Sequence, residues 1–186
     1  MKKIIFLLVF TPILISAQSF KLGFDFEPSY VRIIRDNKSE PLGGEIGPPI
    51  AVTIIPGYVL NKKLTLQGHI GYTLLSLEFS GFEIGMNSLY NFSKRIYASV
   101  GFRHHSNEPN SAGNNLSVDS MTLFMLTAGM GYKTSKHFAL ELEYYYPIKK
   151  KKFVYLCNTC EYNPSGIFNY MLRLNLVFRW EREKWE

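Results

Sequence analysis

The stretch that decides the fold is GIFNYMLRLNLVFRW, which runs from Gly166 to Trp180. Its residues alternate between two kinds, as the two faces of a β-strand require. One face carries Phe168, Tyr170, Leu172, Leu174, Leu176, Phe178 and Trp180, and the other carries Asn169, Met171, Arg173, Asn175, Val177 and Arg179. The run is long for a soluble strand but suits a tilted strand that crosses a membrane. An apolar face opposite arginines and asparagines predicts a barrel strand with lipid outside and a polar lumen inside.

The same two-residue period recurs along the chain, whereas the period of an α-helix hardly appears. We predict strands over residues 19–31, 48–60, 64–79, 81–91, 95–107, 118–133, 137–148 and 166–180. The links after the second, fourth and sixth strands are short, with cores NKK, FSK and TSK, and those after the first, fifth and seventh are long. The link after the third strand, near Ser80 and Gly81, is short and breaks this alternation.

Short turns at one end and long loops at the other are the plan of an outer-membrane barrel. The sequence therefore predicts an all-β fold, an eight-stranded antiparallel up-and-down transmembrane β-barrel. The N-terminus and the short turns would face the periplasm, and side chains would fill the lumen of so small a barrel. A soluble periplasmic lipid-binding barrel is the weaker alternative, because it needs an apolar interior and a polar exterior.

The N-terminus, MKKIIFLLVFTPILISAQ, resembles a secretory signal peptide. A basic start precedes an apolar run, and Ser16-Ala17 offers a small-residue cleavage site. The apolar run is short for a membrane-spanning helix. We expect residues 1–17 to be removed and residues 18–186 to form one barrel domain in the outer membrane. An aromatic content of 15% favours the barrel, because membrane barrels carry aromatic girdles at both interfaces.

Both cysteines lie in one short motif, CNTC, as Cys157 and Cys160. In an exported protein this motif predicts a local disulfide within a long loop. The alternatives are a redox pair or half of a zinc site. A zinc site would need two further ligands, and no second Cys/His cluster has the spacing. We predict neither a metal site nor a cofactor.

The predicted strand RIYASVGFRHHSN, residues 95–107, holds the candidate site. Its apolar face ends in His104 and Ser106, beside a long loop, so we expect both side chains to point towards lipid at the outer end. From one shared face the imidazole of His104 can reach the Ser106 hydroxyl and act as its general base. This geometry suits an esterase that works on a lipid in the outer leaflet.

The opposite face of this strand carries Arg103 and His105, which we expect to point into the lumen. Arg103 would pair there with carboxylates such as Glu141 or Glu143. The alternative to catalysis is a polar strand end that only meets the lipid headgroups. A one-residue slip of the strand register, at a bulge near Gly101, would turn both site residues into the lumen.

A general base needs an acid that orients it. Asp119 is the first candidate, since the predicted next strand would bring it beside His104 at the outer rim. On this interpretation Asp119 shares a lipid-facing side with three apolar residues, Met121, Leu123 and Met125. Glu108, in the loop, is the second candidate. Asn107 can supply an oxyanion donor through its side-chain amide or its backbone N–H.

The motif HHSN at residues 104–107, followed by PNSAGNN, resembles the lipid A deacylase (PagL-like, acyloxyacyl hydrolase) family. That family consists of eight-stranded outer-membrane barrels with a His and a Ser two residues apart on the outer wall, then an Asn, and an acid about a dozen residues later. The resemblance implies that Ser106 attacks the ester of a 3-hydroxyacyl chain on lipid A and that His104 transfers the proton. Asp119 stands near the place of the acid, which is usually Glu in the family. Aligning GNN instead would place Asn114 or Asn115 there.

The second functional hypothesis is a non-catalytic small barrel with a structural or surface-binding role. Its long loops, which contain Lys149 to Lys152, would then bind a partner or anionic headgroups. Under the esterase hypothesis the partner is lipopolysaccharide in the outer leaflet. Either way we expect a membrane-embedded chain without a nucleic-acid partner. A homodimer is compatible with the sequence, which also leaves open the acyl chain and the identity of the acid.

Overall fold

The computed structural model describes residues 20–35, 38–42, 48–74, 79–108, 111–112, 116–118, 121–150, 152–157 and 165–181. The predicted signal peptide, Asp119 and Cys160 lie outside these residues, and Cys157 is described by its backbone only. Within the described residues, no helix is long and apolar enough to cross a membrane.

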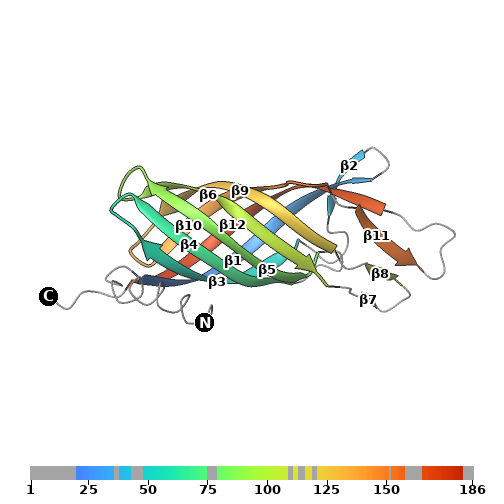
Figure 1. The fold of residues 1–186 in the computed structure, drawn as a ribbon, viewed down its shortest axis with the longest axis horizontal. Coiled ribbons are helices and arrows are strands. Elements are labelled where there is room, and N and C mark those ends of the chain that lie inside the picture. Colours follow the sequence, from blue (N-terminus) through green and yellow to red (C-terminus); the bar gives the residue numbers. More distant parts are fainter. Residues whose placement is uncertain are drawn as a thin grey trace, which may run out of the picture.

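A closed antiparallel barrel forms the body of the molecule (Figure 1). Its strands, in order around the wall, are β1 (Phe20–Arg35), β3 (Ile50–Val59), β4 (Leu64–Leu74), β5 (Gly81–Asn91), β6 (Ile96–Asn107), β9 (Met121–Lys133), β10 (Phe138–Pro147) and β12 (Ser165–Glu181). Pairing of β1 with β12 closes the ring. The predicted fold, an eight-stranded up-and-down barrel, is therefore confirmed.

Shorter strands extend the wall at the loop end. They are β2 (Lys38–Leu42), β7 (Ser111–Ala112), β8 (Leu116–Val118) and β11 (Lys152–Cys157). β2 continues a hairpin from β1, and β11 pairs with both β12 and β8. The period-two reading did not predict these strands, because they lie in segments that were assigned to loops.

One predicted boundary is wrong. The third predicted strand was extended to Phe79, but β4 ends at Leu74 and Phe79 lies outside any strand. The Phe79 ring is instead fully buried at the outer end of the lumen, where it stacks on His105 with the ring centroids 3.9 Å apart. In the sequence, an aromatic residue that follows an alternating run resembles a continuation of the strand. Here the Phe79 side chain turns into the lumen instead.

The outer wall carries the apolar residues, as a membrane barrel requires. Ile54, Ile70, Val100, Leu126, Met130, Leu142 and Leu174 all expose more than a third of their surface around its middle. Exposed aromatic residues follow towards both ends, with Tyr90, Phe92, Tyr132 and Trp180 near the short turns and Tyr30, Phe82, Phe124 and Tyr146 near the loops. This is the reverse of a soluble barrel, so the soluble alternative is wrong.

A network of buried charges fills the middle of the lumen. Arg173 donates to both oxygens of Glu83 and to Glu27, each over 2.6 Å, and to Ser29 over 3.0 Å. Arg103 forms ion pairs of 3.5 Å with Glu27 and with Glu83, and it pairs with Glu143 at 3.8 Å, as predicted. These side chains are inaccessible to solvent, and each charge faces an opposite one. Such a network gives the polar lumen a single arrangement.

The outer end of the lumen is apolar, which was not predicted. Met121, Leu123 and Met125 are buried there, at exposures of 7%, 0% and 0%, in one cluster with Phe79. The prediction that these three β9 residues face lipid is wrong. Thr122, Phe124 and Leu126 face outward instead. The lumen is apolar at its outer end, so the β9 residues there are mostly apolar on both faces. Alternation alone therefore could not distinguish the lumen face from the lipid face.

Candidate active site

The register of β6 places the candidate site. Residues Ile96–Asn107 pair with β5 on one side and with β9 on the other without any shift, so no bulge occurs at Gly101. His104 and Ser106 therefore lie on the outer wall and are partly exposed, as predicted. His105 and Asn107, on the inner face, are buried at 0% and 2% exposure.

Gly101 and Gly81 bring β5 and β6 close together beside the site. A Cβ at Gly81 would lie 2.0 Å from the Ser106 carbonyl oxygen, and one at Gly101 would lie 2.1 Å from the Met86 carbonyl oxygen. Neither position therefore accepts a larger residue without displacing backbone. The close approach holds the register that sends His104 and Ser106 outward.

Each site residue has defined neighbours on the adjacent strands. Ser106 lies between Phe82 on β5 and Thr122 on β9. His104, two residues earlier, lies between Ile84 and Phe124. The imidazole and the hydroxyl thus stand on a surface that is otherwise mostly apolar. No hydrogen bond joins the two side chains in the part of the chain that the structure describes.

A groove of about 360 Å³ opens on the outer wall beside His104. Thr122, Phe124, Ile148 and Lys149 complete its lining. The backbone N–H of Ile148 donates to the Phe124 carbonyl over 2.9 Å, which extends the β9–β10 ladder and fixes this rim. The groove therefore brings together the His104 imidazole, the Thr122 hydroxyl and the Lys149 ammonium at the outer edge of the lipid-facing belt. Phe124 and Ile148 form its apolar walls.

The sequence reasoning missed Thr122 and Lys149. Thr122 was placed on the lumen side, because its neighbours Met121 and Leu123 were assigned to lipid. Lys149 was treated as part of a basic loop. The one available signal was a polar Thr at the outer end of a strand, directly across from Ser106.

The acid candidates take different positions. Glu108 is exposed on the face of Ser106, and its Oε2 accepts a hydrogen bond of 2.7 Å from the Tyr72 hydroxyl. Four residues separate it from His104, which is roughly 13 Å along a strand. Glu108 is therefore too distant to orient that imidazole from this position. Asp119 lies outside the described residues, two positions before Met121, which pairs with Asn107.

Asn107 faces away from the site, and its backbone is paired with β5 and β9. Its side chain points into the lumen, where Oδ1 lies 3.4 Å from Nε2 of His105. Of the two oxyanion donors considered for Asn107, the side-chain amide is on the wrong side of the wall. Within the described part of the chain, no cluster of His, Cys, Asp and Glu is arranged to hold a metal ion.

Comparison with known proteins finds likeness in the fold. No protein-family model and no curated protein sequence matches the chain. The structure of outer membrane protein OprG from Pseudomonas aeruginosa is similar, with 10% identity, a TM-score of 0.49 and coverage of 88% of this chain and 97% of that one. Ail, the attachment invasion locus protein of Yersinia pestis, has 13% identity and a TM-score of 0.49, with coverage of 87% of this chain and 99% of that one. Neisserial surface protein A has 17% identity and a TM-score of 0.44, with coverage of 83% of this chain and 96% of that one.

These likenesses say nothing about activity. The membrane assignment rests on the closed ring, the lipid-facing belt and the two aromatic girdles of the chain itself. The chain is an eight-stranded β-barrel of the outer membrane.

Proposed function

We propose that this barrel is an outer-membrane esterase that removes an ester-linked acyl chain from lipid A. The observation that carries the proposal is the position of His104 and Ser106. Both are partly exposed on the lipid-facing wall, at its outer end and on one face of one strand. Polar side chains on that surface have no part in the lumen network that stabilises the barrel.

The proposed reaction is acyl transfer to serine followed by hydrolysis. Ser106 Oγ attacks the ester carbonyl, and His104 takes its proton and returns it to the departing sugar hydroxyl. Water then attacks the acyl-enzyme with His104 again as the base, which releases the fatty acid and restores Ser106. Asp119 stays the proposed orienting acid on the resemblance alone, because Met121, whose face it was expected to share, points into the lumen. Glu108 is hydrogen-bonded to Tyr72 and lies too far along the strand. The Asn107 backbone is paired with β5 and β9, so the proposed oxyanion donor is the Thr122 hydroxyl.

The groove beside His104 supports a lipid substrate. Phe124 and Ile148 offer apolar contact for an acyl chain, and Lys149 places a cation at the level where a lipid A phosphate would lie. The Thr122 hydroxyl lies directly across from Ser106 and can donate a hydrogen bond to the ester or its oxyanion.

A non-catalytic barrel is the second candidate. It is favoured by one observation, that no carboxylate among the described residues hydrogen-bonds to His104. In this case the polar strand end would only meet headgroups, and the loop strands β8 and β11 would form a surface for a partner.

Mass spectrometry of lipid A tests the proposal. The host should make lipid A with ester-linked 3-hydroxyacyl chains and express the wild type, Ser106→Ala or Ser88→Ala. Ser88 is the matched control, because it lies on the same lipid-facing wall but opposite Val100, nearer the short turns. We expect loss of one hydroxyacyl chain with the wild type and Ser88→Ala, and intact lipid A with Ser106→Ala. Intact lipid A with all three folded proteins would favour the non-catalytic barrel.

A further inference from the structure

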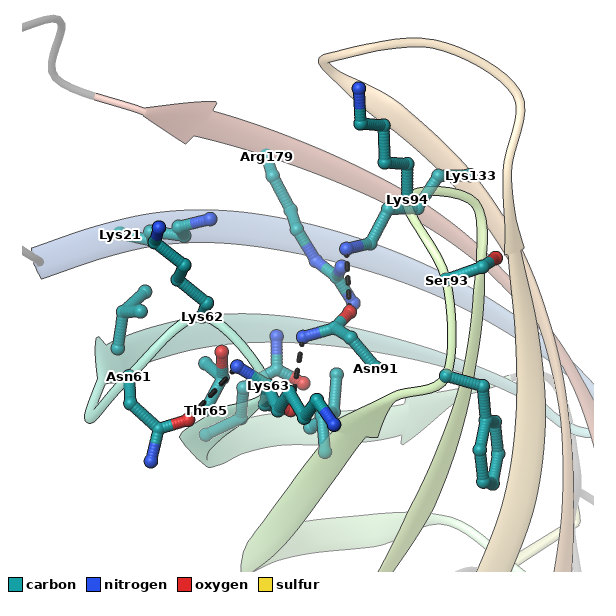
Figure 2. Close-up of a pocket in the computed structure, with 14 residues that line it drawn as sticks. Lys21, Asn61, Lys62, Lys63, Thr65, Asn91, Ser93, Lys94, Lys133 and Arg179 are labelled. Atoms are coloured by element: carbon teal, nitrogen blue, oxygen red, sulfur yellow. Dashed lines mark hydrogen bonds between the residues drawn. The ribbon is translucent and has the colours of Figure 1, made fainter.

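The lumen opens at the short-turn end into a basic hollow of about 330 Å³ (Figure 2). We call it the basic vestibule and define it by its six cationic side chains, Lys21, Lys62, Lys63, Lys94, Lys133 and Arg179. Asparagine and serine side chains lie among them, and none of the described lining residues is an Asp or a Glu. At neutral pH the vestibule therefore gathers about six positive charges around a space large enough for a small ligand.

Two of the short turns supply half of these cations through the same local geometry. In the first turn the Asn61 side-chain oxygen accepts hydrogen bonds of 2.9 Å from the backbone N–H groups of Lys63 and Leu64. In the second, Ser93 Oγ accepts from Arg95 and Ile96 over 3.2 and 3.0 Å. The capping side chain fixes the turn and leaves the lysines after it exposed. These lysines form no ion pair with any residue that the structure describes.

The inner wall supplies two further cations, which both pack against one aromatic ring. Arg179 and Lys133 lie over the ring of Tyr97, at 5.2 and 5.5 Å from its centroid. Arg179 also donates to the Tyr97 hydroxyl over 3.2 Å, and its Nε is buried without a hydrogen-bond partner. The Lys133 ammonium donates to Asn91 Oδ1 over 2.7 Å (Figure 2). A guanidinium with an unused buried donor at the base of a hollow is a preformed contact for an anion.

Tyr97 links the vestibule to an acid of the lumen. It is fully buried, and its hydroxyl donates to Glu141 over 3.2 Å while it accepts from Arg179. Glu141 and Glu143 are not among the residues that line the vestibule. Positive charges that gather in a half-enclosed space repel one another, and a bound anion relieves this repulsion.

We propose that the basic vestibule binds a multivalent phosphate-type anion on the periplasmic side of the barrel. Arg179 offers a planar fork for two phosphate oxygens, and the lysines offer point charges around it. Asn61, Asn91 and Ser93 lie among the cations and can complete the hydrogen bonds. The anion can come from a free phosphate ester or from the headgroup of an anionic phospholipid in the inner leaflet. This inference does not depend on the esterase proposal.

Calorimetric titration with pyrophosphate tests the proposal on purified barrel in nanodiscs of neutral phosphatidylcholine. Lys62→Gln/Lys94→Gln removes two vestibule charges from exposed turn positions. Arg95→Gln/Lys136→Gln is the matched control, because it removes two charges from exposed short-turn positions at the same end of the barrel, outside the lining. We expect the first variant to bind about tenfold more weakly and the control to bind within about twofold of the wild type, since contacts with half-exposed charges are modest. Absence of binding, or equal weakening by both variants, would overturn the proposal.

Nanodiscs that contain phosphatidylglycerol distinguish the two sources of the anion. If a headgroup occupies the vestibule, these discs weaken pyrophosphate binding to the wild type more than to Lys62→Gln/Lys94→Gln. If the ligand is a free phosphate ester, the ratio between the two proteins is the same in both kinds of disc. The variant thus corrects for the general repulsion of anions by a charged bilayer.

Discussion

Two neighbouring histidines on β6 face opposite environments. His105 is buried in the lumen, where Nδ1 lies 2.9 Å from a Glu83 oxygen and the ring stacks on Phe79. His104, one residue earlier, is partly exposed on the outer wall, and its imidazole makes no hydrogen bond with any described residue. Of these two histidines, His105 is thus part of the packed interior, whereas the side chain of His104 makes no contact that the fold requires. A polar residue that a fold places on its lipid-facing wall without needing it there is a candidate for chemistry.

The largest expected effect comes from exchanging the two histidines for alanine. His104→Ala removes the proposed base and should lower ester hydrolysis by about 10²–10⁴-fold, with little change in stability. His105→Ala removes one of several contacts to Glu83 and the ring that stacks on Phe79. It should lower the free energy of unfolding by about 1–3 kcal/mol, while the folded fraction stays active. Deacylation rates in micelles and urea unfolding measure the two quantities. Equal activity of the two variants, after correction for folded fraction, would contradict the assignment of the base.

The acid can be identified by a second pair of variants. Asp119→Asn should lower deacylation by up to about 10⁴-fold if it orients the His104 imidazole, whereas Glu108→Gln should change the rate less than about threefold. The physical reason is distance, because Glu108 is held against Tyr72. The reverse result, with Glu108→Gln inactive, would mean that the Tyr72 contact breaks when substrate binds.

The lumen network predicts a large effect on stability alone. Arg173→Met removes the cation that joins Glu27 to Glu83, so two buried carboxylates lose a principal partner. We expect the free energy of unfolding to fall by about 3–5 kcal/mol. Arg32→Met is the control on the partly exposed side of β1 and should stay within about 0.5 kcal/mol. Urea unfolding in lipid vesicles, followed by tryptophan fluorescence, gives both values, and similar losses would mean that the network adds little.

The smallest expected effect tests the close packing beside the site. Gly101→Ala would place a Cβ 2.1 Å from the Met86 carbonyl oxygen and should cost about 1–3 kcal/mol. Gly57→Ala meets nothing nearer than 3.6 Å and should change stability by less than about 0.5 kcal/mol. Urea unfolding again provides the comparison. If Gly101→Ala is tolerated, the two strands can separate without cost and the site is less rigid than the structure indicates.

The barrel and most of its faces were predictable from sequence, because alternation in a strand reports directly which side each residue takes. On β6 this reasoning placed His104 and Ser106 correctly. It failed at the start of β9, where the residues that face lipid and those that face the lumen are both apolar. Met121, which faces the lumen, could not be distinguished by type from Phe124, which faces lipid. The reasoning also failed at Phe79, which stacks on His105. Phe168 was assigned to the lipid face but is buried in the lumen, because the register of β12 with β1 shifts between Tyr170 and Phe168.

Partners across the lumen could not be predicted. Arg173 and Glu83 are 90 positions apart, and their meeting depends on barrel tilt and side-chain reach rather than on any local pattern. The basic vestibule had a signal that was not used. The short links read NKK, SKR and SKH, so each carries a capping residue followed by two basic or imidazole side chains. That recurrence predicts cations gathered at one end.

The bond from Arg173 to Glu27 has a consequence for how the protein is assembled. It joins the first and last strands of the ring from the inside, over 2.6 Å, in addition to their backbone pairing. An open sheet would have to hold both charges without each other, and a gap between these strands would expose them to hydrocarbon. We therefore expect insertion to end in a single all-or-none closing step, after which the seam does not admit lipid.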